Sequence, residues 1–161
     1  MFDSITISKF NGPLRFSSNV DWLQNDQNNL CVIAYDYIKN LYKIGGANIV
    51  LKKNISRGSG LGSGSSNAAT IMKGLREIYN LKVTDNELIK IGSRIGADVP
   101  FFINGFTQVG EGIGEKLTII NSSMDAQYLI VTPDISIDTK WAHSQYKNNS
   151  VSYTHLRAHE T

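Results

Sequence analysis

The residues with the clearest chemical consequence lie between positions 58 and 70, in the run Gly-Ser-Gly-Leu-Gly-Ser-Gly-Ser-Ser-Asn-Ala-Ala-Thr. Residues 47–51 precede this run with the composition of a β-strand, and apolar residues follow it at helical spacing. A glycine loop between a strand and a helix N-terminus presents backbone N–H groups, and the helix dipole adds positive potential. The run therefore predicts an anion site, and a nucleotide phosphate is the anion that suits it best.

Two common phosphate motifs do not fit this loop. No Gly-Lys-Ser/Thr follows it, so it is not a Walker A loop, and no register gives Gly-x-Gly-x-x-Gly. A flexible linker is the other interpretation of a glycine-serine run. Its place at a strand-to-helix transition favours the anion site.

The composition restricts the class of protein. The chain has 161 residues, 41% apolar and 19% charged, which predicts one folded domain, and a net charge of +2 does not indicate nucleic-acid binding. Cys31 is the single cysteine, so no internal disulfide is possible, and its apolar helix pattern favours a buried thiol over a nucleophile. No stretch of transmembrane length and no signal-peptide pattern is present, which predicts a cytoplasmic protein without a membrane partner.

The N-terminal half predicts strands and a helix. Asn11-Gly12 lies between alternating apolar residues and predicts a β-hairpin. A helix after the polar segment 25–29 is expected to turn one apolar face inward, and Gly45-Gly46 is expected to end it. That face comprises Leu30, Ala34, Ile38 and Leu41.

The second half of the sequence also predicts both helices and strands. Thr84-Asp-Asn-Glu87 predicts a capping box that opens a helix with Leu88, Ile91 and Ile95 inward and Gly96 at its end. Asn104-Gly105 predicts a second pair of strands within 101–109, and further strands are expected at 117–120 and 128–132. Because strands and helices do not alternate regularly, the fold class is α+β.

Several motifs together are similar to those of the GHMP kinases, the superfamily of galactokinase, homoserine kinase and mevalonate kinase. They are Gly60-Leu-Gly-Ser-Gly-Ser-Ser-Asn-Ala-Ala69, Gly96-Ala-Asp-Val-Pro-Phe-Phe102, Gly110-Glu-Gly-Ile-Gly-Glu115 and Asn29-Leu30 at a helix start. Within the superfamily they most resemble kinases that phosphorylate 4-diphosphocytidyl-2-C-methyl-D-erythritol, over roughly residues 2–147. The resemblance implies an α+β N-terminal domain of the ribosomal protein S5 domain 2-like type, with ATP and Mg²⁺ as cofactors and a small-molecule substrate.

The resemblance also implies a catalytic role for Asp98. From the residues alone, an aspartate before a proline turn is usually structural. In the family pattern this aspartate is the general base that accepts the proton of the substrate hydroxyl. We therefore expect its carboxylate to face a partly desolvated cleft.

The same resemblance assigns phosphate contacts to the backbone of the loop, with Ser65 and Ser66 near the magnesium-bound end of ATP. The loop comprises Ser56, Arg57, Gly58, Ser59, Gly60, Leu61, Gly62, Ser63, Gly64, Ser65 and Ser66. For Arg57, a phosphate contact and a solvent-exposed side chain both remain open. The segment 110–115 is interpreted as a structural turn.

Three further positions match the family pattern. Lys53 and Asn29 match positions near the adenine, with a solvated strand-end lysine and a helix-capping asparagine as the alternatives. Thr139 matches a position near the transferred phosphate.

The ends of the chain depart from the family. The lysine-bearing first strand, a Gly-Tyr-His substrate segment and the C-terminal domain are not found, so we expect residues 1–149 to be a domain truncated at both ends. Residues 150–161 resemble vector read-through, although His155 and His159 have the spacing of a metal pair on a helix. The alternative functions are another GHMP kinase of the homoserine or mevalonate-pathway type, or a non-catalytic phosphate- or RNA-binding module.

Overall fold

The computed structural model describes residues 1–24, 26, 28–112, 116–121, 127, 129–131, 141 and 144–145. Its main sheet contains β1 (Ser4–Phe10), β2 (Arg15–Ser18) and β3 (Gly46–Lys52) in the order β1-β3-β2. The strand β3 pairs antiparallel with β1 and parallel with β2. The expected hairpin at Asn11-Gly12 is therefore wrong, because β3 lies between the two strands that the turn connects.

A close backbone approach accompanies this topology. Gly46 begins β3 directly beneath the β1–β2 connection, and a Cβ at Gly46 would lie 1.7 Å from the carbonyl oxygen of Gly12. Glycine is needed here for space. The helix before β3 does not end on glycine, because Lys43 takes the left-handed C-cap conformation with φ 53°.

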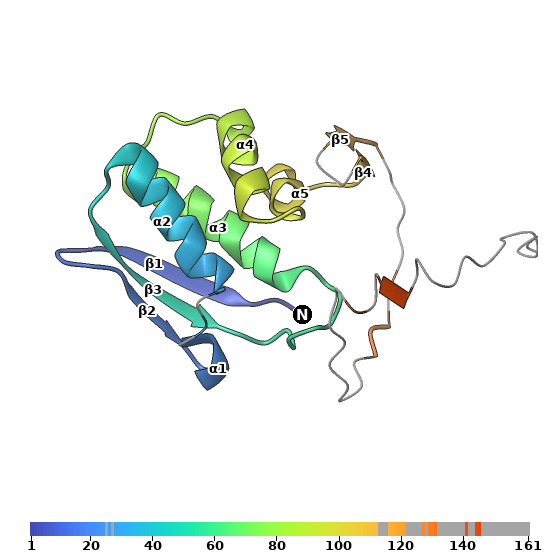
Figure 1. Cartoon of the computed structure of the whole chain (residues 1–161), viewed down its shortest axis with the longest axis horizontal. Coiled ribbons are helices and arrows are strands. Elements are labelled where there is room, and N and C mark those ends of the chain that lie inside the picture. The colour runs from blue at the N-terminus through green and yellow to red at the C-terminus, as the bar shows by residue number, and fades with distance from the viewer. Residues whose placement is uncertain are drawn as a thin grey trace, which may run out of the picture.

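One face of the sheet is covered by helices α2 (Leu30–Tyr42) and α3 (Ser63–Ile78), which also pack against each other (Figure 1). The short α1 (Asp21–Gln24) lies beside β2. Helix α5 (Val99–Asn104) packs against α3, and α4 (Asp85–Ile95) packs mainly against α5, with further contacts to α2 and α3. A separate antiparallel pair is formed by β4 (Gln108–Glu111) and β5 (Lys116–Ile119). The α+β class is thus confirmed.

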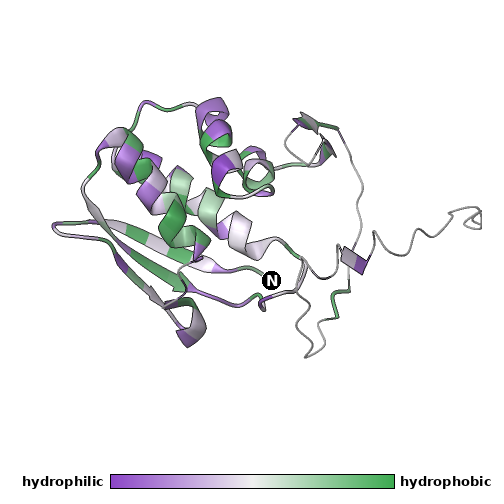
Figure 2. Cartoon of the chain, in the orientation of Figure 1, coloured by the Kyte–Doolittle hydropathy of each residue, from purple (hydrophilic) through white to green (hydrophobic). Residues whose placement is uncertain are grey.

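The core lies between the sheet and the helices. Its buried side chains include Ala34, Tyr35, Ile38, Ile49, Leu51, Ile71, Met72, Leu75, Leu88, Val99 and Ile103. Leu41 is 51% exposed, since the inward face of α2 runs through Cys31, Ala34, Tyr35 and Ile38. In Figure 2 the first turns of α3 are nearly white, in agreement with their serine, glycine and alanine content.

Local signals in the second half give mixed results. The capping box of Thr84 and Glu87 is present, and Gly96 is the C-cap of α4. The strands expected around Asn104-Gly105 are wrong, because Pro100 occupies the first turn of α5 and Gly105 ends that helix with φ 69°. The strand expected at 117–120 corresponds to β5, whereas the described residues 129–131 belong to no strand.

Adjacent glycines allow a matched test of the close approach. We expect Gly46→Ala to lower the free energy of unfolding by about 1–3 kcal/mol or more, since the clash is with backbone. Gly45→Ala is the control, because its Cβ would make an ordinary 3.5 Å contact with the Tyr79 hydroxyl. Urea midpoints measure both, and equal midpoints would contradict the steric explanation.

Cys31 provides a second test of the core. Its side chain is 3% exposed, and desolvation by burial raises the pKa of the thiol to about 12. We expect iodoacetamide at pH 8 to modify the folded chain at least about 100-fold more slowly than the urea-unfolded chain, because little thiolate forms. Equal rates would indicate a reactive cysteine.

Candidate functional site

The glycine loop connects the end of β3 to the start of α3. Gly58, Gly60 and Gly62 have φ values of 70°, 73° and 63°, in the left-handed region that favours glycine. Gly62 is the N-cap of α3 and provides no capping side chain. The first N–H groups of a helix have no intrahelical acceptor, so this 16-residue helix presents backbone donors and its positive dipole end at the loop.

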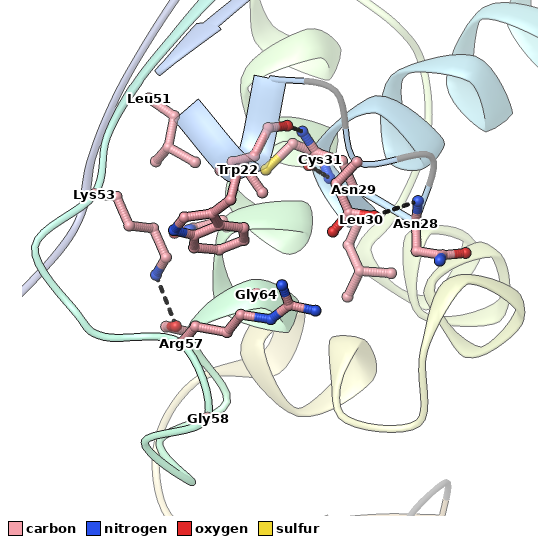
Figure 3. A pocket seen from close by; sticks show the side chains of 14 residues that line it. Trp22, Asn28, Asn29, Leu30, Cys31, Leu51, Lys53, Arg57, Gly58 and Gly64 are labelled. Carbon is pink, nitrogen blue, oxygen red and sulfur yellow. Dashed lines mark hydrogen bonds between the residues drawn. The ribbon is translucent and has the colours of Figure 1, made fainter. Parts of the chain in front are cut away.

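A cavity of about 180 Å³ opens on one side of the loop, between α1, α2 and the end of β3 (Figure 3). Its walls are apolar and aromatic toward the core and polar toward the loop. The lining residues are Trp22, Leu23, Asp26, Asn28, Asn29, Leu30, Cys31, Leu51, Lys53, Arg57, Gly58, Ser63, Gly64 and Asn67.

Arg57 bridges the loop to α1 across this cavity. Its guanidinium lies 5.0 Å from the centroid of the Trp22 ring, in cation–π geometry, and Trp22 is 40% exposed. Figure 3 shows the arginine side chain extended from the loop into the cavity. Arg57 is exposed as well as in contact with Trp22, so both possibilities, a phosphate contact and a solvent-exposed side chain, stay open.

Asn29 caps α2 and lines the same cavity. Its Oδ1 accepts a hydrogen bond from the Cys31 N–H at 3.0 Å, and its Nδ2 donates to the Leu23 carbonyl at 3.1 Å. The side chain is thus held by two internal bonds at 2% exposure. This arrangement agrees with the helix-capping alternative and leaves one amide hydrogen for another acceptor.

Lys53 is paired inside the protein. Its Nζ lies 2.6 Å from Asp3 Oδ2 and donates to Ser63 Oγ at 2.8 Å, and its side chain is 7% exposed. The alternative of a solvated strand-end lysine is therefore wrong. Burial raises the pKa of the Asp3 carboxyl, but hydrogen bonds from Lys53, Ile55, Asn54 and Asn67 outweigh it and hold that pKa below its ordinary value. Sequence reasoning missed Asp3, since only the β1–β3 register brings it to Lys53.

A second cavity, of about 330 Å³, adjoins residues 60–62 of the loop, with Asp98 among its lining residues. The others are Gly60, Leu61, Gly62, Ala97, Phe101, Phe102, Gln108, Gly110 and Leu117. Asp98 is the N-cap of α5, makes no capping hydrogen bond and is exposed. The carboxylate of Asp98 thus lies in a cavity beside the loop, as the sequence pattern led us to expect. It is exposed in the structure, whereas we expected it to be partly desolvated.

The remaining serines of the loop line neither of these two cavities. Ser65 and Ser66 lie half-buried in the first turn of α3, and Ser56 is exposed and Ser59 half-buried before it. Thr139, residues 113–115 and the histidine pair of the tail fall outside the described residues.

Neither a metal centre nor a membrane span is built from the described side chains. No three His, Cys, Asp or Glu residues gather there in a way that could hold a metal ion, and no helix is long and apolar enough to span a membrane. Mg²⁺ is commonly bound by one or two carboxylates together with substrate phosphates. Asp98 and the serine hydroxyls of the loop fit that mode, in which the nucleotide supplies further ligands.

Comparison with known proteins gives a consistent result. Residues 29–106 match the family described as "GHMP kinases N terminal domain". The chain is 36% identical over 153 residues to "4-diphosphocytidyl-2-C-methyl-D-erythritol kinase" of Acetivibrio thermocellus, covering 94% of this chain and 54% of that protein. The protein of the same name from Prochlorococcus marinus is 40% identical over 144 residues, with 88% and 46% covered.

Solved structures agree. A crystal structure of 4-(cytidine 5'-diphospho)-2C-methyl-D-erythritol kinase matches with a TM-score of 0.61 and 31% identity, covering 73% of this chain and 41% of that one. Homoserine kinase from Cytophaga hutchinsonii matches at 0.57 and 16% identity, covering 89% and 54%, and supports the fold alone. The chain spans about half the length of the curated relatives it matches. Residues 29–106, which include the strand–glycine loop–helix unit, thus belong to the GHMP kinase family as part of its N-terminal domain.

Proposed function

We propose that this chain provides the nucleotide-binding part of an ATP-dependent kinase that phosphorylates the 2-hydroxyl of 4-diphosphocytidyl-2-C-methyl-D-erythritol. The carrying observation is that one glycine loop forms a wall of two cavities, one lined by Trp22 and Leu30, the other by Asp98. An adenine base in one cavity and a phosphate acceptor in the other would then share the phosphates bound by this loop. Relatives of this chain are named as kinases of this substrate, which supports the choice of acceptor. We include a cytoplasmic location in the proposal.

In this mechanism the loop backbone binds the ATP phosphates, and the N-terminus of α3 stabilises their negative charge. Trp22 and Leu30 line the cavity in which the adenine is bound. Ser65, Ser66 and Asp98 are the side chains that would face Mg²⁺, which would supply positive charge to offset that of the nucleotide phosphates.

Asp98 would act as the general base in the other cavity. Its carboxylate accepts the proton of the substrate hydroxyl as the oxygen forms its bond to the γ-phosphorus, and ADP departs with the electron pair of the broken P–O bond. Exposure of Asp98 is compatible with this role if bound substrate excludes water from it.

Two other functions use the same loop. Another GHMP small-molecule kinase would keep the nucleotide side and differ in the acceptor. A non-catalytic phosphate- or RNA-binding module would use the loop for anions alone, and the net charge of +2 provides little attraction for RNA. Magnesium-dependent protection by ATP against unfolding supports a kinase, whereas salt-sensitive RNA binding supports the module.

The activity is tested by phosphorylation assays with cytidine-diphosphate-methylerythritol, homoserine and phosphomevalonate. The assays compare three proteins: the 161-residue chain, the chain cut after Asn149, and the complete product of its gene. We expect turnover of the cytidine substrate by the complete product, almost none by the 161-residue chain, and equal ATP binding with and without residues 150–161. Turnover of another acceptor in preference, or ATP binding that needs residues 150–161, would contradict the proposal.

The loop assignment predicts that Gly62→Val weakens ATP binding by about tenfold or more in titration calorimetry, while the chain stays folded. A side chain is strained at φ 63°, and its Cβ would lie 2.9 Å from the Phe102 ring. Gly105→Val is the control, since it has a similar φ of 69° and no neighbour within 4 Å. An unchanged affinity in Gly62→Val would refute the loop assignment.

The role of Asp98 predicts that Asp98→Asn in the complete gene product lowers kcat by about 100-fold or more, with ATP affinity retained. Asparagine preserves the shape but cannot accept the proton. Asp36→Asn is the control, because Asp36 is exposed on α2 and lines neither cavity. A normal kcat in Asp98→Asn would make Asp98 a structural turn residue.

A further inference from the structure

The carboxylate of Asp3 is nearly sealed from solvent, at 2% side-chain exposure. Its Oδ1 accepts hydrogen bonds from the backbone N–H groups of Asn54 at 2.7 Å and Ile55 at 2.8 Å. Its Oδ2 accepts from Lys53 Nζ at 2.6 Å and Asn67 Nδ2 at 2.9 Å. A buried carboxylate with four donors is fully satisfied, and its lowered pKa keeps it ionised at neutral pH.

These donors come from the two ends of the glycine loop. Residues 53–55 lead out of β3 into the loop, and Asn67 belongs to the second turn of α3, just after it. Lys53 adds a second link, because its Nζ also donates to Ser63 Oγ in the first turn of α3. One carboxylate therefore connects the chain that enters the loop with the helix that leaves it.

The register of the sheet sets this connection. In the antiparallel pairing of β1 with β3, Ser4 lies opposite Lys52, so the next pair along the strands is Asp3 and Lys53. A carboxylate placed one residue before β1 thus meets the ammonium placed one residue after β3.

Between these anchors the loop has no regular secondary structure to hold its backbone. The stretch 56–62 belongs to no strand or helix, and its glycines at 58, 60 and 62 adopt left-handed backbone. A loop that binds an anion through its N–H groups must hold them in position before the ligand arrives, since ordering them later costs affinity.

We propose that Asp3 is a positioning residue for nucleotide binding, which holds both ends of the glycine loop through Lys53, Asn67 and the backbone of residues 54–55. The inference rests on the proposed function, because it assumes that the loop binds nucleotide. Lys53 connects the anchoring of the loop with the proposed nucleotide site. Two of its three N–H donors are used by Asp3 and Ser63, and its side chain also lines the cavity of about 180 Å³ that contains Trp22 (Figure 3).

The first measurement is the affinity of the 161-residue chain for Mg-ATP in titration calorimetry. We expect Asp3→Asn to raise Kd by about tenfold or more, the effect of losing a charge-assisted hydrogen bond, because the amide N–H₂ would face two donors. Asp85→Asn is the matched control: it breaks the Arg76–Asp85 pair, also 2.6 Å long, which involves neither the loop nor its cavities. Binding to Asp3→Asn as tight as to the parent, with the variant folded, overturns the proposal.

The second measurement is a double-mutant cycle with Lys53→Met. If Asp3 acts through Lys53, part of its effect on Kd must vanish in the Lys53→Met background, so the two losses multiply to more than the double variant shows. Fully independent effects overturn the route through Lys53. Should Asp3→Asn not fold, Ser63→Ala tests the same link at the exit of the loop, and we expect a smaller rise in Kd.

A third measurement needs no nucleotide. Trypsin cleavage after Arg57, inside the loop, should accelerate at least about fivefold in Asp3→Asn relative to cleavage after Lys43, an exposed residue after α2. A purely global loss of stability would accelerate both sites equally and overturns the positioning role. If the parent chain fails to bind ATP, the proposed function fails, while this measurement still decides whether Asp3 holds the loop.

Discussion

The central strand β3 is the element on which the rest of the site depends. Ala47, Ile49 and Leu51 are buried beneath α2 and α3, and the strand pairs on both edges, so its position admits little adjustment. Such a strand fixes where the backbone leaves the sheet, and hence where the glycine loop begins. The fit depends on small residues at both ends of β3, with Gly46 passing beneath the Gly12 carbonyl and glycines after Lys52 turning the chain into α3.

The charge balance of the loop follows from this placement. Lys53 stands at the end of β3, where a phosphate-binding cation would be expected, yet its charge is offset by Asp3 at 2.6 Å. Attraction for an anion must then come largely from oriented backbone N–H groups, the α3 dipole and Arg57. Arg57 already lies against the Trp22 ring at the cavity, and no carboxylate in the part of the chain that the structure describes forms an ion pair with it.

Local sequence signals predicted the elements better than their pairing. The capping box at Thr84, the amphipathic face of α3 and the loop at a strand-to-helix transition depend on neighbours within a few residues, and all three are present. The two Asn-Gly predictions failed for different reasons. At Asn11-Gly12, local turn chemistry cannot reveal that β3, some 35 residues later, occupies the place beside β1. At Asn104-Gly105, the nearby Pro100 lies in the first turn of a helix within an apolar run, and Gly105 ends that helix. Asp3 was missed on the same ground, because its partners are 50 and more residues away.

The two cavities are mechanically connected through the last glycine of the loop. Gly62 lies so close to the Phe102 ring that a Cβ there would come within 2.9 Å of it, and Phe102 belongs to α5, whose N-cap is Asp98. A change in the loop backbone at Gly62 must therefore either move that ring or be resisted by it. The helix that carries the carboxylate rests against the segment that presents the N–H donors. The distance between donors and carboxylate is then set by side-chain packing rather than by a flexible connection, and a transfer reaction that depends on positioning requires such an arrangement.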